Sequence, residues 1–173
     1  MCGLPASGKT TTAEGIHAYA GGVLIRSCDV FADLGISLPD WVRKTRGFTE
    51  NVRDYERVRD EAYREMARRL EGALAARAPL VIVDAVHGER EKRTEVYRVC
   101  SEFQATPLVL WCRCDDFEET RRRFSRREGR DREPQNEASD LSVFRHIASL
   151  WEDPMGDRTL TGQEVPVAVI RTV

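Results

Sequence analysis

The chain is poor in lysine and has no long hydrophobic run. No apolar stretch approaches the roughly 18–20 residues that span a bilayer, and none has the pattern of a signal peptide. Of the 27 basic residues only Lys9, Lys44 and Lys92 are lysines, so arginine dominates. The formal net charge of −2 favours neither nucleic acid nor a membrane surface as a partner. We therefore expect a cytoplasmic protein without a membrane partner. The number of arginines does not by itself indicate a function, whereas their placement can.

The cysteines lack the spacing of a metal site or a redox motif. There are five, at Cys2, Cys28, Cys100, Cys112 and Cys114. The last two are separated by one residue, which does not give C-x-x-C, and no His or Cys partners stand at zinc spacing. Most lie in or beside apolar runs, where cysteine behaves as a small hydrophobic residue. We expect reduced thiols, in keeping with a cytoplasmic protein.

A glycine-rich motif at residues 3–10, GLPASGKT, matches G-x-x-x-x-G-K-[ST], the phosphate-binding P-loop. Its glycines allow a turn whose N–H groups point inward as an anion-binding nest, and the helix that follows adds its positive end. Lys9 can reach the β- and γ-phosphates, and the Thr10 hydroxyl can ligate Mg²⁺. We predict that the phosphates of ATP contact Gly3, Leu4, Pro5, Ala6, Ser7, Gly8, Lys9, Thr10 and Thr11.

Apolar strands and amphipathic helices alternate after this loop. The patterns predict strands near 23–28, 80–83, 107–112 and 166–170, and helices near 8–20, 52–77, 89–104, 116–128 and 139–152. Residues 29–51 are expected to form a substrate-facing loop with a short helix. Such alternation is typical of an α/β fold with a parallel sheet between two helical layers. Without repeats or a long linker, residues 1–173 are expected to form one domain, with a lid over about 121–138.

The strand that normally precedes a P-loop is nearly absent. Only Met1 and Cys2 stand before Gly3, whereas strands usually have about 5–6 residues. We therefore expect a P-loop NTPase fold whose first strand is largely missing from this chain. We also expect the true start to lie ~5–10 residues upstream.

Acidic residues follow two of the predicted strands. Functional groups gather at the carboxyl ends of parallel strands. Asp84 ends an apolar run in the Walker B pattern, and we predict that it holds Mg²⁺ together with Thr10. Asp29 is the candidate base for a hydroxyl acceptor, and Asp33, one turn later, is the weaker candidate. Asp84 and Asp29 could instead cap helices.

Arginines are concentrated between positions 121 and 132. The group consists of Arg121, Arg122, Arg123, Arg126, Arg127, Arg130 and Arg132. On a helix, Arg122 and Arg126 share one face, and Arg123 and Arg127 share another. One or two of them could close over the transferring phosphoryl group. The alternative is a solvated helix face whose arginines pair with neighbouring glutamates.

These motifs together resemble a known family. GLPASGKTT, CD after the second strand, VIVDAVHGEREKR at the third strand and WCRCDDFEETRRRFSRR before an SD-led helix resemble small P-loop kinases. These form the polynucleotide-kinase-like group, also described as AAA_33 or zeta-toxin-like domains. The resemblance covers about residues 3–153. It implies a five-stranded sheet of order 2-3-1-4-5, ATP, Mg²⁺ and phosphorylation of a hydroxyl.

The resemblance also implies roles for individual residues. Asp29 matches the acid that acts as base, and Arg93 matches a position that is often basic. Arg122 and Arg126 match lid positions, within a register of one turn. The acid stands in CDVF, outside a paired-acid motif, and members use polynucleotides, tRNA, sugars and antibiotics, so the acceptor stays open.

The sequence thus predicts a kinase that transfers the γ-phosphate of ATP to a hydroxyl of a small molecule or a nucleic acid. The candidate catalytic residues are Lys9, Asp29, Arg122 and Arg126, and the candidate metal ligands are Thr10 and Asp84. A nucleic-acid acceptor could bind through Arg43, Lys44 and Arg46. The alternatives are an ATP-hydrolysing switch and an ATP-binding module, both without an acceptor.

Overall fold

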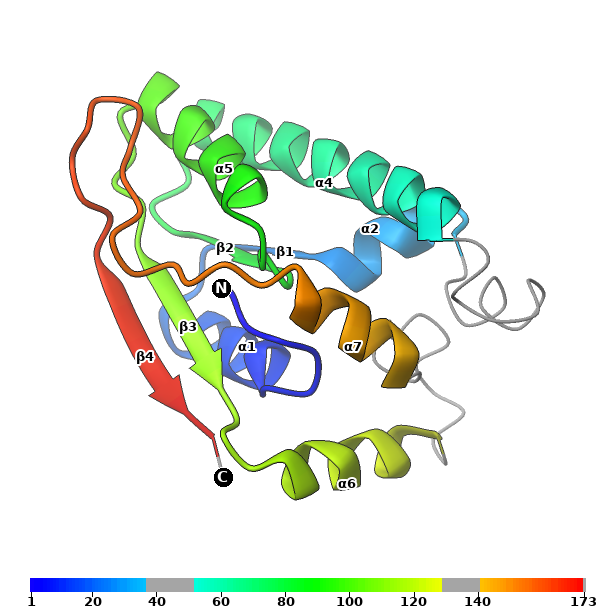
Figure 1. The fold of residues 1–173 in the computed structure, drawn as a ribbon. Helices are drawn as coiled ribbons and strands as arrows, with labels where there is room; N and C mark the ends of the chain where they lie inside the picture. Colours follow the sequence, from blue (N-terminus) through cyan, green and yellow to red (C-terminus); the bar gives the residue numbers. More distant parts are fainter. Residues whose placement is uncertain (37–51, 129–140, 173) are drawn as a thin grey trace.

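The fold alternates between strands and helices, as the sequence predicts (Figure 1). The computed structural model describes residues 1–36, 52–128 and 141–172. In chain order the elements are α1 (Lys9–Ala20), β1 (Val23–Arg26), α2 (Ser27–Asp33), α4 (Val52–Ala75), β2 (Val81–Asp84), α5 (Arg90–Glu102), β3 (Val109–Arg113), α6 (Phe117–Glu128), α7 (Leu141–Ser149) and β4 (Val167–Arg171).

The described strands form two parallel pairs. In the first pair Val23 of β1 lies opposite Val81 of β2, and the pairing continues to Arg26 opposite Asp84. In the second pair, β3 and β4 are paired over their whole length. Val109 lies opposite the first residue of β4, and the last residues of the two strands lie opposite each other. Parallel pairing brings the carboxyl ends of the strands of each pair to one edge, where functional groups of α/β proteins gather.

The first two residues lie between these pairs. Cys2 donates a backbone hydrogen bond to Leu110 of β3 and accepts one from Cys112, each at 2.9 Å. The amino group of Met1 donates to the carbonyl of Val83 in β2 at 2.8 Å. The short segment therefore occupies the position of the central strand in the order 2-3-1-4-5. A hollow of about 700 Å³ lies between β2 and β3 beside it.

Helices cover both faces of the β1–β2 pair, with α1 on one side and α4 with α5 on the other (Figure 1). The apolar stripe of α4 supplies the buried residues Tyr55, Met66 and Leu70, which pack in one core with Phe31 and Val83. Among the described helices, none combines the length and the apolar character that a membrane crossing needs. These layers agree with the predicted three-layer α/β architecture.

The ends of one predicted strand and one predicted helix differ from the structure near the site and in α7. The strand expected over 23–28 ends at Arg26, and residues 27–33 form α2 instead. Serine and aspartate are favourable in a first helical turn, so Asp29 lies inside a helix and not on a strand end. The helix expected over 139–152 is α7, which ends at Ser149. The Ser139-Asp140 pair that precedes it in the sequence lies outside the described residues.

The side chain of Asp116 caps the first turn of α6. The Asp116 carboxylate accepts hydrogen bonds from the backbone N–H groups of Glu118 and Glu119 at 2.8 and 3.1 Å. These are two of the N–H groups that a helix cannot satisfy internally. Capping fixes the start of α6 and with it the register of the arginines that follow.

Candidate phosphate-binding site

The P-loop lies where β2 and β3 end. The N–H of Gly3 donates to the carbonyl of Val86, just beyond β2, at 3.0 Å. On the β3 side, a Cβ at Gly3 would lie 2.4 Å from the carbonyl oxygen of Cys112, so no larger residue fits there. Gly8 has a φ of 84° and forms the N-cap of α1, a conformation that glycine adopts without strain. The loop therefore leads directly into the positive end of a helix.

Lys9 is folded across the loop. Its ammonium group donates to the carbonyl of Leu4 at 2.9 Å, and the N–H of Ser7 donates to the same oxygen at 3.2 Å. Lys9 is only 9% exposed. The lysine is thus held beside the loop interior, where a phosphate oxygen could replace the carbonyl as its partner.

Thr10 and Asp84 come together from positions 74 residues apart. The Thr10 hydroxyl donates to Asp84 Oδ2 at 2.8 Å, and Asp84 is 3% exposed. Among the described side chains, Asp84 Oδ1 and Ser7 Oγ are buried without a hydrogen-bond partner. A buried carboxylate oxygen beside a hydroxyl fits Mg²⁺, which prefers oxygen ligands.

The described acidic residues beside Thr10 are too few to coordinate a metal ion without further ligands. Within the described part of the chain, no group of three or more His, Cys, Asp or Glu residues could hold a metal. Mg²⁺ usually binds through one or two carboxylates together with substrate phosphates and water. Thr10 and Asp84 therefore fit a magnesium site that the phosphates of a bound nucleotide would complete.

Asp29 is held by Arg26. Arg26 Nε and Nη2 donate to the two oxygens of Asp29 at 2.7 and 2.8 Å, and its Nη1 donates to Glu14 at 2.6 Å. The hydrogen bonds that Arg26 donates to Asp29 raise the pKa of Arg26, so the guanidinium stays charged. Burial raises the pKa of the neighbouring Cys28 thiol to about 11, which keeps that group neutral. Asp29 is thus a fixed, half-exposed carboxylate near the end of β1.

The arginines of α6 have different surroundings. Arg122 is 60% exposed and forms an ion pair with Glu119. Arg123 also pairs with Glu119, at 2.8 Å, but it reaches the P-loop and donates to the carbonyl of Ala6 at 3.0 Å. The side chain of Arg126 lies outside the described residues, as do Arg43, Lys44 and Arg46. The structure therefore brings Arg123 to the loop, one residue from the predicted Arg122.

Arg93 is part of a buried structural network. Its Nε donates to Asp157 at 2.6 Å, and both side chains are at most 2% exposed. Its Nη1 donates to the carbonyls of His87 and Gly88, each at 3.0 Å, and the hydroxyl of Tyr97 donates to Asp157 at 2.9 Å. Arg93 therefore fixes the backbone that follows β2, and all of its donors in this network are directed to protein oxygens.

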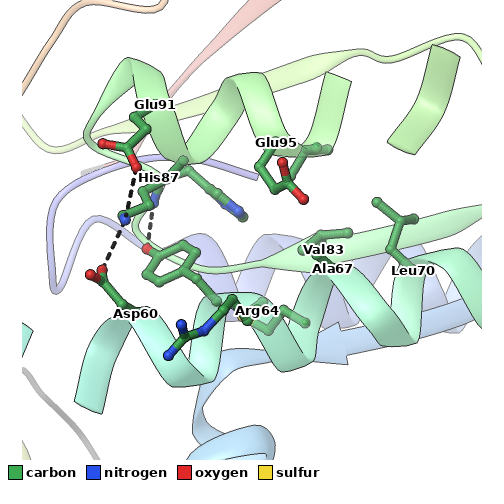
Figure 2. Close-up of a pocket in the computed structure, with 12 residues that line it drawn as sticks. Asp60, Arg64, Ala67, Leu70, Val83, His87, Glu91 and Glu95 are labelled. Atoms are coloured by element: carbon green, nitrogen blue, oxygen red, sulfur yellow. Dashed lines mark hydrogen bonds and ion pairs between the residues drawn. The ribbon is translucent and has the colours of Figure 1, made fainter. Parts of the chain in front are cut away.

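A separate cavity of about 380 Å³ lies between α4 and α5 (Figure 2). Three of its charged groups pair with one another, since Lys92 contacts Asp60 at 2.8 Å and Glu91 at 3.7 Å. At its inner end the backbone N–H of His87 donates to the hydroxyl of Tyr63 at 3.1 Å. Burial lowers the pKa of His87 to about 3, so this ring stays neutral. Residues 3–10 do not line this cavity, which is distinct from the phosphate site.

The sequence pattern does not indicate Arg26 or Thr172, and it includes Arg123 only as one member of the arginine group between positions 121 and 132. Thr172 follows β4, and its hydroxyl oxygen lies 3.1 Å from the carbonyl oxygen of Ser7. Reading the carboxyl end of every strand could have found Thr172, because the last strand was predicted. No sequence signal distinguishes Arg123 from the two arginines that precede it.

Comparison with known proteins finds a matching family profile and similar solved structures. The family profile of AAA_33, described as an AAA domain, matches residues 1–148. A solved structure of shikimate kinase from Acinetobacter baumannii in complex with shikimate has 16% sequence identity and a TM-score of 0.49. The match covers 84% of this chain and 77% of that one. The comparison with curated proteins found no significant match.

Proposed function

Because the chain belongs to the AAA_33 family of P-loop kinase-like domains, we propose that it transfers the γ-phosphate of ATP to a hydroxyl group of a small molecule or a nucleic acid. The observation that carries the proposal is the contact of Thr10 with Asp84 beside the P-loop. It joins the metal-binding hydroxyl of the motif to the acid at the end of β2. That combination is the one that P-loop phosphotransferases use to hold Mg²⁺.

ATP is the proposed phosphoryl donor, held by the P-loop residues Gly3, Leu4, Pro5, Ala6, Ser7, Gly8, Lys9, Thr10 and Thr11. The backbone N–H groups of the loop and the first turn of α1 would bind the phosphates. Lys9 would exchange the carbonyl of Leu4 for phosphate oxygens, with which its charge forms stronger hydrogen bonds. The unpartnered hydroxyl of Ser7 offers one further donor inside the loop.

Thr10 and Asp84 would hold Mg²⁺ through the hydroxyl oxygen and the buried carboxylate. When bound, the metal neutralises the charge that develops on the phosphates. The hydrogen bond between these residues fixes the direction of both oxygens before the metal arrives. The unpartnered Asp84 Oδ1 supports this role, because a buried carboxylate oxygen is costly unless a hydrogen-bond donor or a cation lies against it.

Asp29 would orient the acceptor hydroxyl. Phosphoryl transfer passes through a loose transition state, so positioning of the hydroxyl contributes more than early removal of its proton. Arg26 holds the Asp29 carboxylate in one direction and leaves it half exposed, which suits a group that accepts a hydrogen bond from a substrate. Contacts of Arg122 and Arg126 with the γ-phosphate stay a prediction.

Replacement of Lys9 tests the proposal. In Lys9→Ala, Mg-ATP turnover should fall by at least about 100-fold, because the charge that stabilises the transferring group is lost. Circular dichroism of the variant should match the unchanged protein, since Lys9 makes its described side-chain contact within its own loop. Turnover close to that of the unchanged protein would refute the proposal.

A further inference from the structure

The outer side of the P-loop is held by two residues from the C-terminal half of the chain. Arg123 Nη1 donates to the carbonyl of Ala6 and to the hydroxyl oxygen of Thr172, each at 3.0 Å. The Thr172 hydroxyl in turn lies 3.1 Å from the carbonyl oxygen of Ser7 and 3.3 Å from that of Arg113. One guanidinium and one hydroxyl therefore contact two successive carbonyls of the phosphate-binding loop.

The orientation of these carbonyls decides the orientation of the phosphate-binding groups. In a trans peptide, the C=O of one residue and the N–H of the next point in opposite directions. Bonds that hold the carbonyls of Ala6 and Ser7 outward therefore hold the N–H groups of Ser7 and Gly8 inward. The N–H of Ser7 indeed points across the loop, to the carbonyl of Leu4.

This part of the loop needs external support. Ala6 has a φ of 63°, a left-handed conformation that costs a non-glycine residue about 1 kcal/mol. The hydrogen bond from Arg123 offsets part of that cost. Thr172 also packs closely against the loop, since a Cβ at Gly8 would lie 3.0 Å from its methyl group.

Both supporting residues are themselves fixed. Arg123 is 19% exposed, and its Nε donates to Glu119, one turn earlier on α6, at 2.8 Å. The backbone N–H of Thr172 donates to the carbonyl of Arg113 at 2.8 Å, which extends the pairing of β4 with β3 by one residue. Thr172 is thus held by the β3–β4 pair, and Arg123 is held on the capped helix α6.

We infer that Arg123 and Thr172 are positioning residues for the P-loop: they hold the carbonyls of Ala6 and Ser7 outward so that the N–H groups that follow face the phosphates. The inference rests on the proposed function. Under this inference, Arg123 of α6 and Thr172 at the end of β4 affect phosphate affinity through the loop backbone, without touching the nucleotide.

The test uses the full chain and inorganic tripolyphosphate as probe, measured by titration calorimetry. Thr172→Val keeps the shape of the side chain and removes the hydroxyl, and we expect affinity to fall about fivefold to tenfold. Thr172→Ser keeps the hydroxyl and should bind within about twofold of the unchanged protein. Arg123→Gln should weaken binding at least as much as Thr172→Val. The melting temperatures of all three should stay close to the original.

Arg171→Gln is the matched control. Arg171 precedes Thr172, is 74% exposed and contacts Asp115 at 3.6 Å, away from the loop. The affinity of Arg171→Gln for tripolyphosphate should equal that of the unchanged protein. Equal affinity of Thr172→Val and the unchanged protein would overturn the inference. A loss of binding that follows a lower melting temperature and is not rescued by serine would overturn it as well.

Failure of the proposed function gives a different result. In that case tripolyphosphate would not bind to the unchanged protein, or it would bind equally well to Lys9→Ala. Loss of binding in Lys9→Ala together with full binding in Thr172→Val would leave the phosphate site standing and remove only the positioning role.

Discussion

Arg26 holds Asp29 with two hydrogen bonds, from Nε and Nη2 to the two carboxylate oxygens at 2.7 and 2.8 Å. The pair joins the end of β1 to the first turn of α2, so the carboxylate has one orientation. If Asp29 orients the acceptor, Asp29→Asn should lower phosphoryl transfer by about 100-fold or more. ATP binding should change less than about twofold, because the P-loop is untouched.

Asp33→Asn is the matched control for that substitution. Asp33 lies one turn later on the same helix and pairs with Arg69 of α4 at 2.8 Å. Transfer of label from ATP to the acceptor should persist in this variant. Loss of transfer in Asp33→Asn with retention in Asp29→Asn would assign the role to Asp33 instead.

Asp84→Asn should raise the Mg²⁺ concentration that supports half-maximal turnover by about tenfold or more. The physical reason is the loss of a negative charge at a buried oxygen that has no other partner. Titration of turnover against Mg²⁺ measures the change. Thr10→Ser, which keeps the hydroxyl, should behave like the unchanged protein. An unaltered Mg²⁺ requirement in Asp84→Asn would argue against this acid as a ligand.

Asp157→Asn should lower the free energy of unfolding by about 3 kcal/mol or more, because it leaves the Arg93 guanidinium buried without its counter-charge. Arg90→Gln is the control. Arg90 contacts the same carboxylate at 3.3 Å but is 60% exposed, so its loss should cost less than about 1 kcal/mol. Urea unfolding measures both values. Similar losses in the two variants would show that the buried Arg93–Asp157 pair is not the main contribution of Asp157 to the free energy of unfolding.

The stability of the protein should depend on the neutral state of His87. Burial lowers the pKa of this ring from 6.5 to about 3, so the unfolded chain binds a proton over this interval that the folded chain excludes. Stability from this residue is therefore complete above about pH 6.5 and is lost as the pH falls toward 3. His87→Phe, which keeps a ring against Tyr63, should flatten that part of the pH profile of the melting temperature. An identical slope in both proteins would exclude His87 as a cause.

Local patterns in the sequence were sufficient for most elements and for the P-loop. The loop, the strand before Asp84 and the cap at Asp116 depend on neighbours within a few residues, so their chemistry can be read directly. The end of β1 was placed too late because an apolar strand and the first turn of α2 follow each other without a glycine or proline. Sequence pattern alone gives no boundary there.

Tertiary contacts could not be predicted in the same way. Arg93 and Asp157 are 64 residues apart and meet only because α5 packs beside the segment that precedes β4. Arg122 and Arg123 are adjacent, and only the docking of α6 decides which of them faces the P-loop. The Arg26–Asp29 pair depends on the helical turn that begins at Ser27, which the sequence reasoning had assigned to a strand.

The most direct test of kinase activity follows the labelled γ-phosphate of Mg-ATP in the presence of a panel of sugars, nucleosides, oligonucleotides and other hydroxyl compounds. Label should move to the hydroxyl of at least one compound, with one ADP formed for each transfer, and Lys9→Ala should abolish this transfer. Release of all the label as inorganic phosphate, at a rate that no compound changes, would refute kinase activity and indicate an ATP-hydrolysing switch.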